Sequence, residues 1–210
     1  IMDKTLTENI SYCDKNSRIL IIACGALAKE IIHIREINNM QNIMDIQCLP
    51  AILHNRPEKI PRLLENKIIE NQEQYKTIMI GYADCGSAGQ IQQICSKYNV
   101  SLITGSHCYE FFSGTDNFNK IQNQELGTFY LTDYLVRHFD SLIIKAYKLD
   151  KIPEMKNMLF NHYKKVVYIA QTDNNYLNEK AKSCADFLGL NYERVITGYG
   201  ELETFIKQGV

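Results

Sequence analysis

The chain has 210 residues, of which 45% are hydrophobic and 22% are charged, and its formal net charge is −1. These values are typical of a globular domain. The chain has no dense basic block, which disfavours sequence-independent binding to nucleic acid, because such binding needs many phosphate-neutralising side chains. No apolar run approaches the ~20 residues of a membrane-spanning helix. We therefore expect neither nucleic acid nor membrane as a partner.

The first residues, 1–17, form a polar leader that lacks the apolar core of a signal peptide. The seven cysteines are an odd number and their spacing fits no known disulfide framework. In a reducing compartment such cysteines are thiols, ligands or core residues. We therefore expect a cytoplasmic protein.

Short apolar runs alternate with segments in which apolar residues recur at helical spacing. In chain order, the pattern predicts strands at 18–23, 45–49, 77–82, 100–104, 166–170 and 192–196, and helices at 26–38, 57–69, 88–98, 176–188 and 201–207. Between 107 and 163 no strand is predicted, and residues 127–139 show helical spacing.

Alternating strands and helices indicate parallel βαβ units covered on both faces. We therefore predict an α/β protein with an open, mostly parallel, Rossmann-like three-layer sheet. Residues 18–210 are expected to form a single domain, with a helical insertion at about 107–163 that could cover the rim of the sheet.

Three cysteines follow predicted strands, each next to a turn and the start of a helical pattern. They are Cys24, Cys85 and Cys108. The carboxyl ends of parallel strands meet at one edge of a sheet, where ligands bind. We therefore expect the three thiols to converge, although they lie far apart in the sequence.

The chemistry expected at these positions depends on the surroundings of each thiol. Cys24 precedes Gly25 and a predicted helix, whose positive end would lower the pKa of the thiol. A buried core cysteine is an equally good interpretation of Cys24 alone. Cys85 lies in a glycine-containing turn that matches neither a phosphate-binding loop nor a dinucleotide fingerprint.

The densest cluster is His107-Cys108-Tyr109-Glu110. Imidazole, thiolate and carboxylate are the usual zinc ligands, and thiolates also hold iron–sulfur clusters. Three thiolates would leave one position open on a zinc ion or on a [4Fe–4S] cluster. Because adjacent residues seldom bind the same ion, we expect one of His107 and Cys108 to be a ligand and the other to orient a substrate or transfer a proton. With Cys108 as the ligand, the metal ligands would be Cys24, Cys85 and Cys108. His107 and Glu110 are then candidates for proton transfer.

Five further residues are candidates for binding a cofactor at the same rim. Gly25, Gly86 and Ser87 lie in the turns after predicted strands, where a helix start favours anions. Gln171 and Thr172 follow the strand at 166–170 and offer an amide and a hydroxyl. The alternative for this last segment is a helix cap.

The remaining cysteines and histidines carry weaker signals. His54 follows a predicted strand and is a second candidate for a site histidine. Cys48 lies in a weak strand, whereas Cys95 and Cys184 are expected on the core faces of helices.

Six ordered motifs together resemble a bacterial and archaeal family of unknown function: Cys-Gly-Ala-Leu (24–27), Gly-Tyr-x-x-Cys-Gly (81–86), Gly-x-His-Cys-Tyr-Glu-x-Phe (105–112), Gly-Thr-Phe-Tyr-Leu-Thr-Asp (127–133), Ala-Gln-Thr (170–172) and Gly-Tyr-Gly-x-Leu (198–202). Members of that family are often encoded beside corrinoid-dependent methyltransferases. The resemblance therefore implies a role in methyl transfer on a methylated small molecule or a thiol. A corrinoid protein or a methyltransferase would be the partner and would supply the corrinoid.

Three functions remain open. The first is a metal-dependent enzyme of methyl transfer or one-carbon metabolism, with zinc or an iron–sulfur cluster. The second is a non-catalytic cofactor-binding or accessory module for a methyltransferase, although the corrinoid-ligand signature Asp-x-His-x-x-Gly is missing from the sequence. The third is a thiol oxidoreductase, against which the lack of a Cys-x-x-Cys pair argues.

Overall fold

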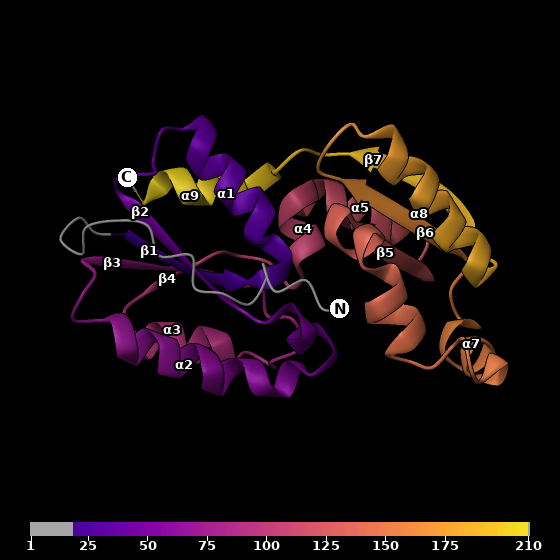
Figure 1. Ribbon diagram of the computed structural model, residues 1–210, viewed down its shortest axis with the longest axis horizontal. Helices are drawn as coiled ribbons and strands as arrows, with labels where there is room; N and C mark the ends of the chain where they lie inside the picture. The colour runs from indigo at the N-terminus through magenta and orange to yellow at the C-terminus, as the bar shows by residue number, and fades with distance from the viewer. Residues whose placement is uncertain (1–18, 210) are drawn as a thin grey trace. The chain divides into compact units, whose positions relative to one another are not determined.

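The computed structural model describes residues 19–209, so the polar leader at 1–17 lies outside the described residues. The described chain divides into two compact units, each with its own parallel sheet. Unit 1 comprises the described residues up to Phe111 together with those from Glu201 onward, and unit 2 comprises Phe112–Gly200. Figure 1 shows the chain coloured by residue number.

Unit 1 is a four-stranded parallel sheet with the strand order β2-β1-β3-β4. Figure 1 shows α1 and α9 on one face of this sheet and α2 and α3 on the other. Its elements are β1 (Ile19–Cys24), η2 (Gly25–Leu27), α1 (Ala28–Ile37), β2 (Met44–Leu49), η3 (Ala51–Asn55), η4 (Pro57–Lys59), α2 (Ile60–Asn71), β3 (Thr77–Gly81), α3 (Gln90–Tyr98), β4 (Ser101–Leu102), the start of α4 (Cys108–Ser113) and α9 (Gly200–Gln208).

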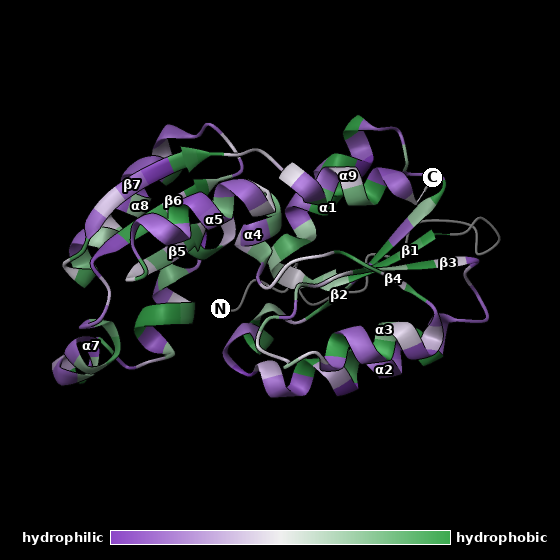
Figure 2. Cartoon of the chain, turned by 180° about the vertical axis from the view of Figure 1, so that it is seen from behind, coloured by the Kyte–Doolittle hydropathy of each residue, from purple (hydrophilic) through white to green (hydrophobic). Residues whose placement is uncertain are grey.

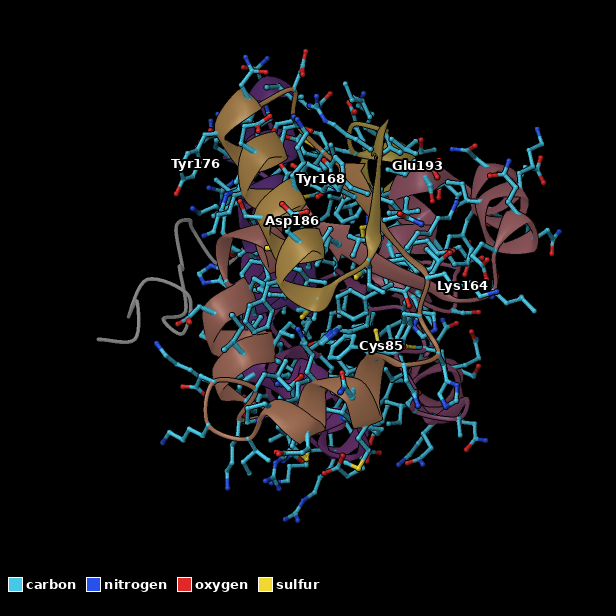
Figure 3. All side chains as sticks on the ribbon, turned by 90° about the vertical axis from the view of Figure 1, so that its right-hand side faces the viewer. Cys85, Lys164, Tyr168, Tyr176, Asp186 and Glu193 are labelled. Carbon is cyan, nitrogen blue, oxygen red and sulfur yellow. The ribbon has the colours of Figure 1, made fainter. Side chains whose placement is uncertain are left out.

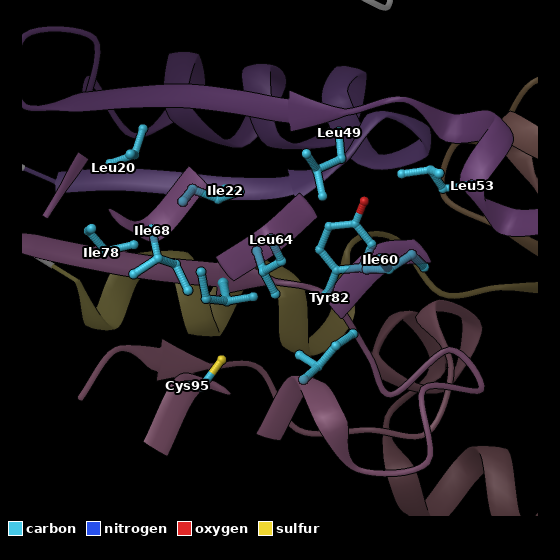
Figure 4. Close-up of a cluster of buried hydrophobic side chains, with 12 residues drawn as sticks. Leu20, Ile22, Leu49, Leu53, Ile60, Leu64, Ile68, Ile78, Tyr82 and Cys95 are labelled. Atoms are coloured by element: carbon cyan, nitrogen blue, oxygen red, sulfur yellow. The ribbon is translucent and has the colours of Figure 1, made fainter. Parts of the chain in front are cut away.

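The central strands of unit 1 are hydrophobic along their whole length because helices cover both faces. Leu20 and Ile22 of β1 are fully buried against α2 and α3, next to Ile78 and Ile80 of β3. Figure 4 shows this cluster, and Figure 2 shows β1 and β3 as mainly hydrophobic, with hydrophilic residues along the helices α2 and α3. Each fully buried isoleucine or leucine contributes about 1.5–3 kcal/mol through the removal of apolar surface from water.

Unit 2 is a three-stranded parallel sheet with the order β5-β6-β7. Figure 3 shows Tyr168 of the central strand within the unit and Tyr176 projecting outward from the start of α8. Its elements are α5 (Thr115–Gln124), β5 (Thr128–Thr132), α6 (Asp133–Arg137), the π-helical turn η5 (Asp140–Lys145), α7 (Pro153–Phe160), β6 (Lys165–Ala170), α8 (Asn175–Leu188) and β7 (Asn191–Ile196).

The predicted α/β class with mostly parallel strands is confirmed. The expected single sheet is wrong, because the strands after residue 163 do not extend the first sheet. They pair instead with β5, which lies inside the region expected to be a helical insertion. Residues 128–132 combine β-branched and aromatic side chains, which fit a pleated sheet better than a helix. The single domain predicted for 18–210 stays a prediction, because two compact units can fold together or separately.

No helix within residues 19–209 is long and apolar enough to cross a bilayer.

A fully buried carboxylate organises the carboxyl end of the sheet in unit 2. Asp133 follows β5 and is 0% exposed. One of its oxygens accepts hydrogen bonds from the Tyr168 hydroxyl (2.7 Å) and the Gln171 backbone N–H (3.0 Å). The other accepts from the Thr172 hydroxyl (2.5 Å) and faces the Arg137 guanidinium at 3.5 Å. These bonds fix the segment that follows β6 against the segment that follows β5.

We expect Asp133→Asn to lower the free energy of unfolding by about 2–4 kcal/mol, because the amide replaces an acceptor with a donor inside a network of donors. Chemical denaturation followed by circular dichroism measures the loss. The control is Asp186→Asn, at an exposed position of α8, which should stay within about 0.5 kcal/mol of wild type. Equal effects of the two substitutions would contradict the role given to Asp133.

Candidate functional site

The winding of unit 1 reverses between β1 and β3. From β1 the chain passes through α1 to β2 on one side, and from β3 it passes through α3 to β4 on the other side. The loops that leave β1 and β3 therefore diverge at the carboxyl ends of the strands, which is where open α/β sheets bind ligands. Cys24 ends β1, and Cys85 lies in the loop after β3. Two of the three predicted ligands thus flank this switch point.

Cys24 is the last residue of β1, in register with Leu49 of β2. Burial raises the pKa of its thiol, against smaller opposite effects of the Ala26 backbone and the Tyr82 hydroxyl. The backbone at the start of the following helix lowers this pKa, as predicted, but burial outweighs it and the net shift is upward. The 3₁₀ turn η2 after Cys24 continues directly into α1.

The turn after β3 holds Cys85 in an unusual backbone conformation. Its φ is +48°, in the left-handed region, and Gly86 follows at +81°. The Asp84 carboxylate stabilises this turn, because its Oδ1 accepts hydrogen bonds from the Ser87 hydroxyl (2.8 Å) and the Gly89 N–H (2.7 Å). The left-handed conformation costs a residue with a Cβ roughly 1 kcal/mol that glycine would not incur. Such strain occurs most often at functional sites.

Backbone hydrogen bonds hold the segments after β3 and β4 together. The Asp84 N–H donates to the Gly105 carbonyl (3.2 Å), and the Cys85 N–H donates to the Ser106 carbonyl (3.0 Å). The Ser106 N–H in turn donates to Glu110 Oε2 (2.6 Å). Glu110, 8% exposed, therefore orients the loop that leads into α4. These three hydrogen bonds place the start of α4 beside the turn that contains Cys85.

Cys108 is the first residue of α4. Burial raises the pKa of its thiol well above the ordinary value, and the neighbouring Cys85 and Cys24 raise it further. His107 stacks on Tyr109 with ring centroids 4.9 Å apart. Burial lowers the pKa of His107, against smaller upward effects of nearby carboxylates, so the imidazole is neutral near pH 7.

Cys24, Cys85 and Cys108 form what we call the thiol cluster. Burial raises the pKa of Cys85 to about 12, with a further contribution from Cys24, and Cys108 interacts with both. The structure thus brings the three predicted ligands into one neighbourhood. Within residues 19–209, however, no three histidine, cysteine, aspartate or glutamate side chains are already arranged to hold a metal ion.

Cys48 also interacts with Cys24, and burial raises its pKa to about 12. Cys48 precedes Leu49, the residue in register with Cys24. Because alternate residues of a strand point to opposite faces of the sheet, its side chain lies on the other face from Cys24. We therefore leave Cys48 out of the thiol cluster.

His54, the second candidate for a site histidine, lies in η3 after β2. Although His54 is exposed, the surrounding protein removes part of the hydration of its ring and so lowers its pKa. The positive charge of a protonated His107 nearby lowers the pKa further. The same segment continues to Pro57, which lies beside the turn that contains Gly86. A Cβ atom added to Gly86 would be in van der Waals contact with Cγ of Pro57, at 3.7 Å. The structure therefore brings His54 to the rim beside His107.

The predicted cofactor-binding residues of unit 1 are Gly25, Gly86 and Ser87, and each lies in a turn that follows a strand. Gly25 is buried in η2. Gly86 supplies a left-handed turn residue, and the Ser87 hydroxyl is bonded to Asp84. A cofactor role for these residues stays a prediction.

Gln171 and Thr172 lie in unit 2, where their side chains are engaged internally. The side-chain oxygen Oε1 of Gln171 accepts from the Asp133 backbone N–H (2.8 Å), and the Thr172 hydroxyl donates to the Asp133 carboxylate. A helix cap is present in the next residues, where the Asn174 side chain accepts from the Leu177 N–H (3.0 Å). A cofactor role for Gln171 and Thr172 likewise stays a prediction.

Sequence reasoning missed Tyr82, which follows β3 and lies against the thiol cluster. Cys24 and Cys85 both pack against the buried cluster that contains Tyr82. A tyrosine at the end of an apolar strand is typical of a core residue, so the sequence carries no separate signal for its hydroxyl.

The fold and the thiol cluster define a doubly wound α/β protein with cysteines at the switch point of its first sheet. The chain belongs to the family described as "Protein of unknown function (DUF1638)", whose model matches residues 48–206. That segment includes Cys85 and the 107–110 cluster, whereas Cys24 precedes it. No curated protein and no solved structure matches the chain.

The Asp84 turn gives a test of how Cys85 is positioned. Its hydrogen bonds lower the pKa of Asp84 below 3.8, so the carboxylate stabilises the fold above that pH, and the contribution is lost as the pH falls through the folded value. We expect Asp84→Ala to cost about 1–2 kcal/mol at pH 7 and progressively less below pH 3.8. Denaturant titrations at several pH values measure this, with the exposed Glu73→Gln as control. A loss that does not depend on pH would contradict the assignment.

Proposed function

We propose that this chain binds a thiophilic metal centre, zinc or an iron–sulfur cluster, through the thiol cluster. The observation that supports the proposal is that Cys24 at the end of β1, Cys85 in the loop after β3 and Cys108 at the start of α4 interact with one another. They do so at the position where this topology binds ligands.

The chemistry of the donors favours a soft metal. Thiolates select zinc, Cu(I) and iron–sulfur clusters over hard cations. A thiolate in a desolvated position is unfavourable unless a cation compensates its charge. Burial raises the pKa of these thiols, as it does for the core cysteines Cys95 and Cys184, so a metal that binds the cluster would release their protons.

Metal binding requires a local rearrangement. The thiols are near enough for their charges to interact, but they do not surround a common point. A cysteine side chain turns about a single torsion, so rotation at the three positions, together with small shifts of the turns, would bring the sulfurs together.

Two neighbouring groups would serve the chemistry at this centre. The neutral imidazole of His107 would accept a proton from an incoming thiol. Glu110 would hold the loop before α4 through the Ser106 N–H. A bound zinc ion supplies stabilisation of a thiolate at neutral pH.

The link to methyl transfer rests on the resemblance of the six motifs. We infer a place in corrinoid-linked one-carbon metabolism, with a methylated small molecule or a thiol as substrate and a corrinoid protein or methyltransferase as partner. A cytoplasmic location is part of this proposal.

Metal analysis of protein purified without oxygen tests the proposal. We expect one zinc ion, or one iron–sulfur cluster with its broad visible absorption, per chain. Cys85→Gly should abolish this binding, whereas Cys184→Ala, at a buried cysteine of unit 2, should retain it.

Cys85→Gly separates loss of the ligand from loss of the fold. Glycine relieves the left-handed φ at this position while the packing of the thiol is lost, so the metal-free variant should stay within about 1 kcal/mol of wild type. Metal-free wild type, or equal metal content in both variants, would contradict the proposal.

The proximity of Cys24 and Cys85 also suits a thiol oxidoreductase. Alkylation of the reduced protein separates the two functions. Labelling that depends on a chelator indicates ligands, and labelling that depends on an oxidant indicates a redox pair.

A further inference from the structure

The outer edge of β4 is an unpaired edge of the sheet in unit 1. The Ile103 N–H donates to the Ile80 carbonyl (3.1 Å), so residue 103 directs its backbone groups toward β3. Because alternate residues of a strand face opposite sides of the ladder, Leu102 and Thr104 direct their N–H and C=O groups away from β3. Among the described residues no strand pairs with this edge. It therefore offers a row of hydrogen-bonding groups to another strand.

The opposite edge of the same sheet, β2, is protected against strand addition. The outward N–H of Met44 donates to the Met40 carbonyl (3.1 Å), and its carbonyl accepts from Arg35 Nη1 (3.4 Å). β2 also carries the buried carboxylate of Asp45. Inward-pointing charges and covered backbone groups are common means of preventing edge-to-edge pairing. Residues 100–104 contain no charged residue and no proline, so nothing in the β4 segment itself opposes such pairing.

A groove of about 520 Å³ lies beside this edge, between β4 and α9. Leu102 packs on the cluster that α2 and α3 contribute to, whereas its neighbour Ile103 is buried on the other side of the strand, toward α9. A strand added to the edge would therefore direct alternate side chains into the groove. The lining comprises residues 101–104 together with Glu201, Thr204, Phe205 and Gln208 of α9.

We propose that a second copy of the chain occupies this edge, with the two β4 strands paired antiparallel across a twofold axis. Strand addition gains affinity from backbone hydrogen bonds and places alternate side chains in an adjoining groove. A twofold contact uses the same surface on both copies, and an uncharged strand edge is self-complementary in this way. The inference does not depend on the proposed metal centre.

The two outward residues of β4 determine the register of the pair. With Ile103 at the twofold axis, Leu102 of each copy lies opposite Thr104 of the other, and each such pair exchanges two backbone hydrogen bonds. The half-buried Leu102 side chain would meet the methyl group of Thr104, on the same face of the joined sheet. No like charges are brought together, because residues 100–104 are uncharged.

Sedimentation velocity of the purified full-length chain over a range of concentrations tests the proposal. We expect a monomer–dimer equilibrium whose dissociation constant rises roughly 10- to 100-fold in Thr104→Pro, because proline removes one outward N–H from each copy. Proline is tolerated on an edge strand where the N–H faces away from the sheet, and Thr104 is exposed. Thr104→Val keeps the N–H and the shape of the side chain, so it should dimerise like wild type.

Amide hydrogen exchange of the wild-type chain gives a second readout, which does not depend on the folding of a variant. Exchange at Leu102 and Thr104 should slow as the chain concentration rises. Exchange at Arg194 should not change with concentration. Its amide lies on the outer edge of β7, because the Thr197 N–H donates to the Ala170 carbonyl and alternate residues face away from β6.

Two results would overturn the proposal. The first is a wild-type chain that stays monomeric at every concentration with rapid exchange at Leu102 and Thr104, as expected if a different protein occupies the edge. The second is a dimer that Thr104→Pro leaves as stable as in wild type, because the contact would then lie elsewhere on the chain. Neither result bears on the metal proposal, which metal analysis tests separately.

Discussion

The reversal of winding between β1 and β3 is the constraint on which the candidate site depends. Parallel pairing places the carboxyl ends of β1, β3 and β4 on one edge, and the reversal separates the loops that leave the two central strands. Cys24 and Cys85 occupy those two loops. The backbone bonds from the Asp84–Cys85 segment to the Gly105–Ser106 segment then bring the start of α4 alongside. Three distant cysteines thus share one neighbourhood because of topology and two hydrogen bonds.

Several groups in this neighbourhood are costly to the fold. Cys85 occupies a left-handed conformation that glycine would adopt more easily. The three thiols are half-buried, and partial loss of hydration raises their pKa values. The proposed thiophilic metal would relieve the last of these costs, since it would ionise the sulfurs and compensate their charge.

Much of unit 1 was predictable from the sequence, because its strands are continuous apolar runs and its turns carry glycine. Parallel pairing alone predicted that the segments carrying Cys24, Cys85 and Cys108 lie at one edge of the sheet, whereas the hydrogen bonds that bring the start of α4 alongside the Cys85 turn could not be predicted. The second sheet was not predictable, since residues 128–132 carry apolar side chains at a spacing that also suits a helix, and strand partners are decided by tertiary packing. The raised pKa of Cys24 was not predictable either, because it depends on burial.

X-ray absorption spectroscopy at the metal edge, on protein purified without oxygen, tests the central claim most directly. The account predicts a first shell dominated by sulfur, at about 2.3 Å if the metal is zinc. A first shell of only nitrogen and oxygen at about 2.0–2.2 Å would contradict it, because the metal would then be bound somewhere other than the cysteines.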